Sequence, residues 1–393
     1  MINIELCLKY FLYITIITIV MDLILGIQGS LLPEGSVPYL AIFFQLSYYI
    51  KFFLACLAIY FIQKFQLTYL FIIILAILGS KAIFGFENIA QPGFYITHLV
   101  FYFYIICGYM LGSSLAQHKI EFPLISGNFI SLVVIFSAIL IILFFSLYSI
   151  GLAPRLSLGF QLFILLPILF AYNASNYSLI TIFILTLLTG KRGVLILFLV
   201  LLGLNKKFTL SLRSMIFLIP ITLLSMSFLA YQIGILQRFE PILILFQEMD
   251  LSDFDGLIGL LYFATGGRSD EIISYLTSGI SFNDILFGRN PGSFFLLFDS
   301  GNLRYVPHHF FHVSPLNYIF HFGFFLGSFI ILIQFKVFIW SIRAFRESKN
   351  LMIGFYQALF IASFLGAIVV VDILFWISFF YSYSLMKQPN IFS

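Results

Sequence analysis

The run Ile130-Ser-Leu-Val-Val-Ile-Phe-Ser-Ala-Ile-Leu-Ile-Ile-Leu-Phe-Phe-Ser-Leu147 decides the fold class, because it holds no charge and only three serines. Strands of a membrane barrel alternate apolar and polar residues at period two. Here, and again in Met215–Ala230, almost every position is apolar. In lipid the backbone must pair internally, and a helix does this within one segment. Such runs therefore predict membrane-spanning helices.

The whole composition agrees with these runs. Of the 393 residues, 62% are hydrophobic and 9% are charged, whereas a soluble domain carries about 25% charged residues. This excludes an ordinary soluble enzyme or binding domain. Cys7, Cys56 and Cys107 all lie in or beside apolar segments, and their spacing fits neither a disulfide framework nor a metal site. We expect no cofactor and no nucleic-acid partner.

A membrane span needs about 20 apolar residues. On that rule the chain is an all-α polytopic membrane protein with about twelve transmembrane helices. The candidate segments are 8–27, 39–62, 69–84, 94–116, 125–148, 157–172, 177–189, 193–204, 215–233, 312–335, 352–368 and 370–386. We interpret 8–27 as an uncleaved first helix rather than a signal peptide, because no small-residue cleavage site follows it.

The placement of Lys and Arg predicts the sidedness of the chain. With the N-terminus in the cytoplasm, the inner segments carry eleven of the 20 cations, whereas the short outer loops 28–38, 85–93 and 149–156 carry only Arg155. Cytoplasmic loops are enriched in Lys and Arg. The eleven inner cations are Lys9, Lys64, Lys119, Lys206, Lys207, Arg213, Lys336, Arg343, Arg346, Lys349 and Lys387.

This orientation puts one large loop, 234–311, in the periplasm. We expect N-terminal transmembrane helices over 1–233, this loop, and C-terminal transmembrane helices over 312–393. The loop holds nine of the 16 acidic residues of the chain. Loops longer than about 15 residues are usually functional or disordered. Because apolar and aromatic residues occur throughout it, we expect a partly helical structure that folds against the membrane domain.

Three glycine-flanked arginines are the first candidates for chemistry. They occur in Gly190-Lys191-Arg192-Gly193, Gly266-Gly267-Arg268 and Gly288-Arg289. Arg recognises phosphate with a bidentate fork, and glycine permits close backbone approach to a ligand. We predict that Arg192, Arg268 and Arg289, with Lys191, hold a lipid-linked pyrophosphate. The alternative is that each Arg reaches the interface or pairs with an acid such as Asp270.

Histidines and acids supply candidates for proton transfer. His308, His309 and His312 lie where the loop returns to the membrane, and His is the commonest general base. We take His312 or His309 as catalytic. The alternatives are an interfacial hydrogen-bonding role and, less favoured, a metal site. Asp270 and Glu271 follow Arg268 closely and either orient that Arg or act as acid and base.

Four more ionisable residues lie within or near the predicted spans: Lys51, Lys81, His98 and Asp372. Charge inside a membrane is costly, so one interpretation is that these residues face a polar cavity. Long side chains near a helix end can also extend to the interface. The sequence leaves both interpretations open for this group.

The order of these elements resembles the O-antigen polymerase and ligase superfamily. Thr189-Gly190-Lys191-Arg192-Gly193 is similar to the T-G-S-R-G segment of that family, and Gly267-Arg268 and Gly288-Arg289 both fit its later G-R element. The family then has an H-N-x-x-L-x-x-L-x-x-x-G element, and here Leu316, Ile319 and Gly323 follow His312 at intervals of four, seven and eleven. Lys191 and Val313 depart from the pattern, and His309 competes for the catalytic position.

The resemblance implies a metal-independent, inverting glycosyltransferase of the GT-C type in the bacterial inner membrane. Its substrate would be an oligosaccharide linked to undecaprenyl pyrophosphate. The arginines would neutralise the pyrophosphate, and His312 or His309 would activate the acceptor hydroxyl. A partner that regulates chain length is expected from the family alone.

Three alternatives to a polymerase remain. An O-antigen ligase would transfer the glycan to lipid A–core and shares the motifs. A lipid-linked oligosaccharide flippase would place its charges within the spans, whereas here they gather in one loop. A scaffold protein would not need the arginines at all.

Overall fold

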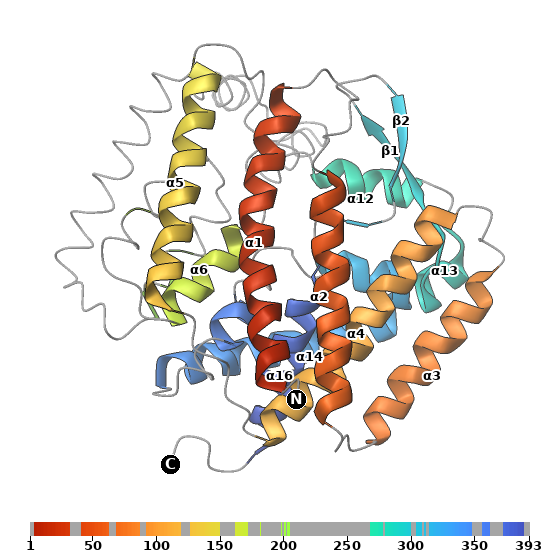
Figure 1. Ribbon diagram of the computed structural model, residues 1–393. Coiled ribbons are helices and arrows are strands. Elements are labelled where there is room, and N and C mark those ends of the chain that lie inside the picture. The colour runs from red at the N-terminus through yellow and green to blue at the C-terminus, as the bar shows by residue number, and fades with distance from the viewer. Residues whose placement is uncertain are drawn as a thin grey trace. The chain divides into compact units, whose positions relative to one another are not determined.

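The computed structural model describes most of the N-terminal half, parts of the large loop and most of the C-terminal helices (Figure 1). The described residues are 4–31, 41–62, 68–86, 92–118, 126–149, 162–171, 268–277, 280–299, 304–308, 310–311, 314–347, 356–361 and 372–388, with the single positions 181, 198, 200, 201, 203 and 204.

The protein is a mostly helical, multi-pass membrane protein. In the described part of the chain, four helices are long and apolar enough to cross a bilayer. They are α1 (Ile4–Leu31), α4 (Pro92–His118), α5 (Gly127–Ser149) and α14 (Ser314–Glu347). Shorter apolar stretches lie in α2 (Ala41–Ile62), α3 (Tyr69–Phe84) and α16 (Ile373–Met386).

The helix bounds follow the predicted segments closely, with one large difference. The helix predicted over 312–335 continues to Glu347 as α14, so Lys336, Arg343 and Arg346 lie on a helix rather than in a loop. Lys and Arg are good helix formers, and all three side chains are exposed.

The predicted segments 177–189 and 215–233 lie almost wholly outside the described residues, and so does most of 193–204. The count of twelve therefore stays a prediction.

The chain forms two compact units. The first unit comprises Met1–Lys81, Leu99–Lys207 and Leu332–Ser393. The second unit comprises Ala82–His98 and Phe208–Ile331. The second unit thus includes the predicted periplasmic loop, together with the end of α3, the start of α4 and the first half of α14.

The first unit is held together by close helix packing. α1 lies beside α2 (Figure 1) and also contacts α5 and α6 (Leu162–Ala171). α4 approaches α16 through Gly108 and Gly112, because a Cβ at Gly108 would clash with Trp376 and one at Gly112 with the backbone of Ile377 and Tyr381. Small residues four apart are a usual contact face between membrane helices.

The second unit has a small mixed core. It contains α12 (Arg268–Thr277), α13 (Phe282–Phe287) and an antiparallel pair, β1 (Phe295–Asp299) and β2 (Arg304–His308). α12 packs against β1, as Figure 1 also shows. Phe295, Phe311 and Phe320 form the core, and Tyr275 packs against it. The first turns of α14 are therefore built into the folded loop.

The strand pair adds β structure to a loop that was expected to be only partly helical. β2 runs through Pro307, which pairs with Leu296 of β1. A two-stranded ribbon consists of edge strands only, and proline is tolerated at an edge. After β2 the chain reaches Phe311, whose N–H and C=O both bond to the Asn317 side chain at 2.7 and 2.8 Å. These two bonds join the end of the loop to the start of α14.

Candidate functional site

The turn that carries Arg289 is specified locally by the sequence. Ser281 caps α13, with its hydroxyl accepting from Asp284 N and the Asp284 carboxylate accepting from Ser281 N, both at 3.1 Å. This capping box satisfies two backbone donors at the helix start. The helix ends at Gly288, whose φ of 74° lies in the left-handed region that favours glycine. The chain can therefore turn sharply directly before Arg289.

A second glycine receives this turn. Gly323 has φ 77° and ψ 175° and interrupts α14. A Cβ at Gly288 would clash with Gly323 N, and one at Gly323 would clash with the Leu286 carbonyl. The Arg289 N–H donates to the Phe320 carbonyl at 2.7 Å, a carbonyl in the turn just before the break. The two glycines thus permit backbone contact between the Gly288-Arg289 element and the 312–323 element.

The Arg289 side chain is mostly enclosed and has several partners. Its Nη1 donates to the Phe294 carbonyl at 2.8 Å. Its Nε lies 3.7 Å from the Asp284 carboxylate, with 12% of the Arg side chain and 31% of the Asp side chain exposed. The guanidinium also lies 5.5 Å from the Tyr275 ring centroid and 6.0 Å from that of Phe320. The alternative of an Arg paired with an acid is thus observed here, with Asp284 as the acid.

Tyr275 brings α12 into the same environment. Burial raises the pKa of its hydroxyl, the nearby Asp284 carboxylate raises it further, and Arg289 opposes both effects. The phenol therefore stays neutral over the physiological range and offers Arg289 an uncharged ring face. α12 begins at Arg268, so one short helix joins the Gly267-Arg268 element to the surroundings of Arg289.

The structure describes some of the other predicted site residues and leaves others outside its described ranges. Asp270 and Arg268 lie in the first turn of α12, and only their backbone is described. Glu271 is buried, with 4% of its surface exposed, which favours an orienting role over direct exchange of a proton with an acceptor.

Four predicted site residues lie outside the described residues, so their roles stay predictions: Lys191, Arg192, His309 and His312. His308 lies in β2, with its ring 6.0 Å from that of Phe295.

A pair of buried histidines lies beside this turn, and sequence reasoning missed half of it. His98 on α4 and His321 on α14 are both fully buried, with ring centroids 4.6 Å apart and planes at 82°. His98 Nδ1 accepts from the Gly292 N–H at 2.9 Å. The position of His98 in an apolar helix was visible in the sequence. His321 stands two residues before the glycine of the 312–323 element, and this position in the motif is the sequence signal that points to it.

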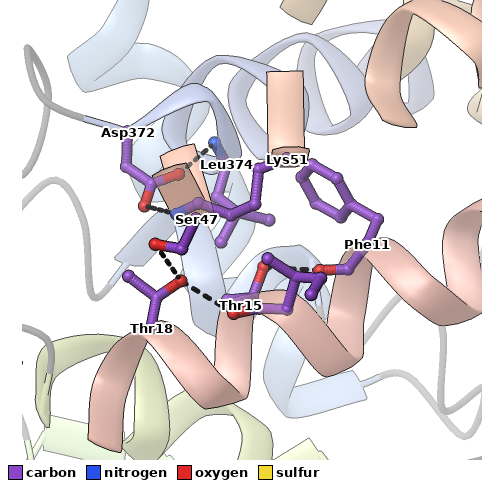
Figure 2. A network of polar contacts seen from close by, with 8 residues as sticks. Phe11, Thr15, Thr18, Ser47, Lys51, Asp372 and Leu374 are labelled. Carbon is purple, nitrogen blue, oxygen red and sulfur yellow. Dashed lines mark hydrogen bonds and ion pairs between the residues drawn. The ribbon is translucent and has the colours of Figure 1, made fainter. Parts of the chain in front are cut away.

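The first unit holds a separate polar network, shown in Figure 2. Lys51 of α2 donates to the Asp372 carboxylate at 2.7 Å, and the two side chains are 1% and 0% exposed. Asp372 is also the N-cap of α16, where its other oxygen accepts from Leu374 N at 3.0 Å. The Lys51 ammonium lies 4.2 Å from the Tyr48 ring centroid. Lys51 and Asp372 therefore face a polar interior of the protein rather than the membrane interface.

Hydroxyl groups of α1 lie close to the ion pair. The Thr18 hydroxyl donates to the Ile14 carbonyl at 2.7 Å and is hydrogen-bonded to the Ser47 hydroxyl at 3.0 Å, and Thr15 donates to the Phe11 carbonyl at 2.8 Å. In lipid, each of these hydroxyls needs a partner within the protein. The bond between Thr18 and Ser47 connects α1 to α2 one turn before Lys51 (Figure 2).

The chain matches no protein-family model, and the searches of curated proteins and of solved structures find no match either.

Proposed function

We propose that this membrane protein is a glycosyltransferase, specifically an O-antigen polymerase. It transfers the growing glycan from undecaprenyl pyrophosphate to the non-reducing end of a new lipid-linked repeat unit in the bacterial inner membrane. The observation that carries the proposal is the contact between Gly288-Arg289 and the 312–323 element.

That contact matters because it joins two of the elements on which the resemblance rests. Each is weak as a short motif. Their direct backbone contact, through Arg289 N and the Phe320 carbonyl at 2.7 Å, is what a shared site requires. Gly323 also has a positive φ of 77°, so the last position of the element has a structural reason to be glycine.

Arg289 would bind a pyrophosphate by exchanging one partner. Its Nε and the Asp284 oxygen are 3.7 Å apart, which is an ion pair beyond hydrogen-bond length. A phosphate oxygen can replace this carboxylate while the bond from Nη1 to the Phe294 carbonyl, at 2.8 Å, keeps the side chain in place. A guanidinium fixed before the substrate arrives stabilises charge on the leaving group without reorganising in the reaction.

The reaction needs one bond formed and one broken. The acceptor hydroxyl oxygen attacks the anomeric carbon, and the bond from that carbon to the pyrophosphate oxygen breaks with inversion. The electron pair leaves on undecaprenyl pyrophosphate, where Arg192, Arg268 and Arg289 with Lys191 would stabilise it. The hydroxyl proton passes to a base, for which His312 and His309 are the candidates, while Asp270 and Glu271 orient Arg268 or act as acid and base. Positioning and charge stabilisation then suffice without a metal.

The test is complementation of a deletion strain, read on a lipopolysaccharide gel. Arg192→Ala, Arg268→Ala and Arg289→Ala should each shorten the polymer ladder strongly. Arg→Lys should restore little, because the planar fork is lost. Arg304→Ala is the matched control, since Arg304 lies in the same loop unit without a flanking glycine. Normal ladders in all three variants, at normal protein levels, would exclude the pyrophosphate assignment.

The same gel separates the proposal from its alternatives. A deletion strain that makes core with a single repeat unit has lost a polymerase. Core without any repeat unit indicates a lost ligase instead. Purified protein that moves lipid-linked units across liposomes, but never lengthens them, is a flippase. Activity of the purified protein should persist in EDTA.

A further inference from the structure

The turn that holds Arg289 is fixed by a second part of the chain, namely Phe84, Gly85 and His98, which lies far away in sequence but within the same unit. Three successive residues of the turn contact it. Asn290 Nδ2 donates to the Phe84 carbonyl at 3.4 Å, and the Pro291 ring lies so close to Gly85 that a Cβ there would clash with it. The Gly292 N–H then donates to His98 Nδ1 at 2.9 Å.

We propose that His98 is a positioning residue for Arg289, acting through an unprotonated Nδ1 that accepts the Gly292 N–H. This rests on the proposed function for the role of Arg289, but not for the contact itself. The bond fixes the backbone three residues after Arg289. It fixes the same turn whose Phe294 carbonyl receives the Arg289 guanidinium at 2.8 Å.

The surroundings of His98 couple its ring to the turn. His98 is fully buried, and its ring packs edge-on against Phe310, Phe320 and His321 at centroid distances of 5.0, 6.4 and 4.6 Å. Phe320 also accepts from Arg289 N at 2.7 Å. The ring of His98 and the backbone of Arg289 are therefore fixed by the same residue of α14. A shift of the imidazole moves the turn as well.

The acceptor role is sensitive to protonation. A proton on Nδ1 converts the acceptor into a donor, so the bond from Gly292 is lost. The titratable neighbour on α14 is His321 at 4.6 Å, and the Gly292 turn itself carries the cation Arg289, which pairs with Asp284. A charge on His98 would be added beside a second imidazole in a buried site. Because a proton on Nδ1 breaks the bond from Gly292, the turn should loosen as the pH falls.

Three substitutions of His98 distinguish loss of the hydrogen-bond acceptor from loss of the imidazole ring. In His98→Asn, the side-chain oxygen occupies nearly the position of Nδ1 and accepts without titrating. In His98→Gln, the amide reaches the position of Nε2 instead. His98→Leu keeps apolar bulk and removes the acceptor. Thr97→Ala is the matched neighbour, because Thr97 is exposed and its hydroxyl donates to the Gly93 carbonyl of its own helix at 2.7 Å.

The first readout is amide hydrogen exchange in the purified full chain, followed by mass spectrometry on peptides that cover Gly292. Exchange should be about tenfold faster in His98→Leu and His98→Gln than in the native protein, and nearly native in His98→Asn and Thr97→Ala. After correction for intrinsic rates, acid should speed exchange in the native protein but not in His98→Asn. If His98→Leu is poorly folded, the comparison of His98→Asn with His98→Gln decides. Equal exchange in these two variants would overturn the proposal.

The second readout is transfer of glycan between lipid-linked repeat units. Loss of the acceptor should lower kcat about tenfold with little change in KM, because a displaced Arg289 acts on charge that develops in the transition state. His98→Asn should restore kcat to within about threefold. Changed exchange in a protein that never shows transfer would reject the proposed function and keep the contact. Native kcat in His98→Gln with fast exchange would reject His98 as a positioning residue.

Discussion

At the scale of single residues, the bilayer makes the pair of Lys51 and Asp372 the most consequential contact. Both side chains are almost fully buried and lie 2.7 Å apart. Removing two charges from water is costly, and the cost is offset only when the geometry and the further hydrogen bonds are good. Asp372 has such a bond, from Leu374 N at 3.0 Å. The carboxylate therefore holds α2 and starts α16 at the same time.

A double-mutant cycle tests this coupling. Lys51→Met should destabilise the protein by about 3–5 kcal/mol, because it leaves a buried carboxylate without its cation. Asp372→Asn should lower the free energy of unfolding by a similar amount, although its side-chain oxygen can still accept a hydrogen bond as the cap of α16. The double variant should recover most of the loss, measured as thermal stability of the purified protein in detergent.

The matched control for this cycle is Lys81→Met. Lys81 lies at the end of α3 and is half-buried, so its removal should cost less than about 1 kcal/mol. If the two single losses simply add in the double variant, Lys51 and Asp372 act independently, and the pair does not fix the start of α16.

At the scale of elements, the break in α14 depends on two glycines. Gly323, at φ 77° and ψ 175°, has a backbone conformation that is essentially confined to glycine. Gly288 has φ 74° and contacts Gly323. Gly323→Ala and Gly288→Ala should therefore each cost about 1–3 kcal/mol from backbone strain alone, with a further loss from the clash. Thermal stability and polymer length should fall together.

Gly79→Ala is the control for these two glycines. Gly79 lies inside α3, and a Cβ there would meet nothing within 4 Å. Alanine in a helix interior is favoured over glycine by about 1 kcal/mol, so this variant should be neutral or more stable. Equal effects at Gly79 and Gly323 would mean that the break in α14 has no special backbone requirement.

The sequence predicted elements much better than it predicted contacts between them. The bounds of α3 were predicted as 69–84, since a continuous apolar run is local information. The break at Gly323 was not predicted, because Phe322-Gly323-Phe324 looks like any apolar helix. At the break Gly323 contacts Gly288, which lies elsewhere in the chain. Likewise Lys51 and Asp372 are 321 residues apart, and His98 and Gly292 are 194 apart.

At the scale of the whole molecule, the proposed polymerase reaction requires that the loop unit face the periplasm, where lipid-linked repeat units would be joined. The distribution of Lys and Arg predicts this sidedness, and cysteine labelling measures it directly. Cys7 and Cys107 are buried and Cys56 is half-buried, so their replacement leaves a clean background. Asn283 in α13 and Glu347 at the end of α14 are both exposed, which makes them suitable positions for single new cysteines.

In intact spheroplasts, a membrane-impermeant maleimide should label Asn283→Cys at once and label Glu347→Cys only after lysis. The reason is that α14 must carry the chain from the outer side of the membrane to the inner side, where Arg343 and Arg346 belong by charge. Its 34 residues are about 51 Å of helix, which is longer than the hydrocarbon core of about 30 Å even after the break at Gly323 is allowed for. The opposite labelling would put Arg289 in the cytoplasm, and a polymerase that acts on exported lipid-linked units could not work there.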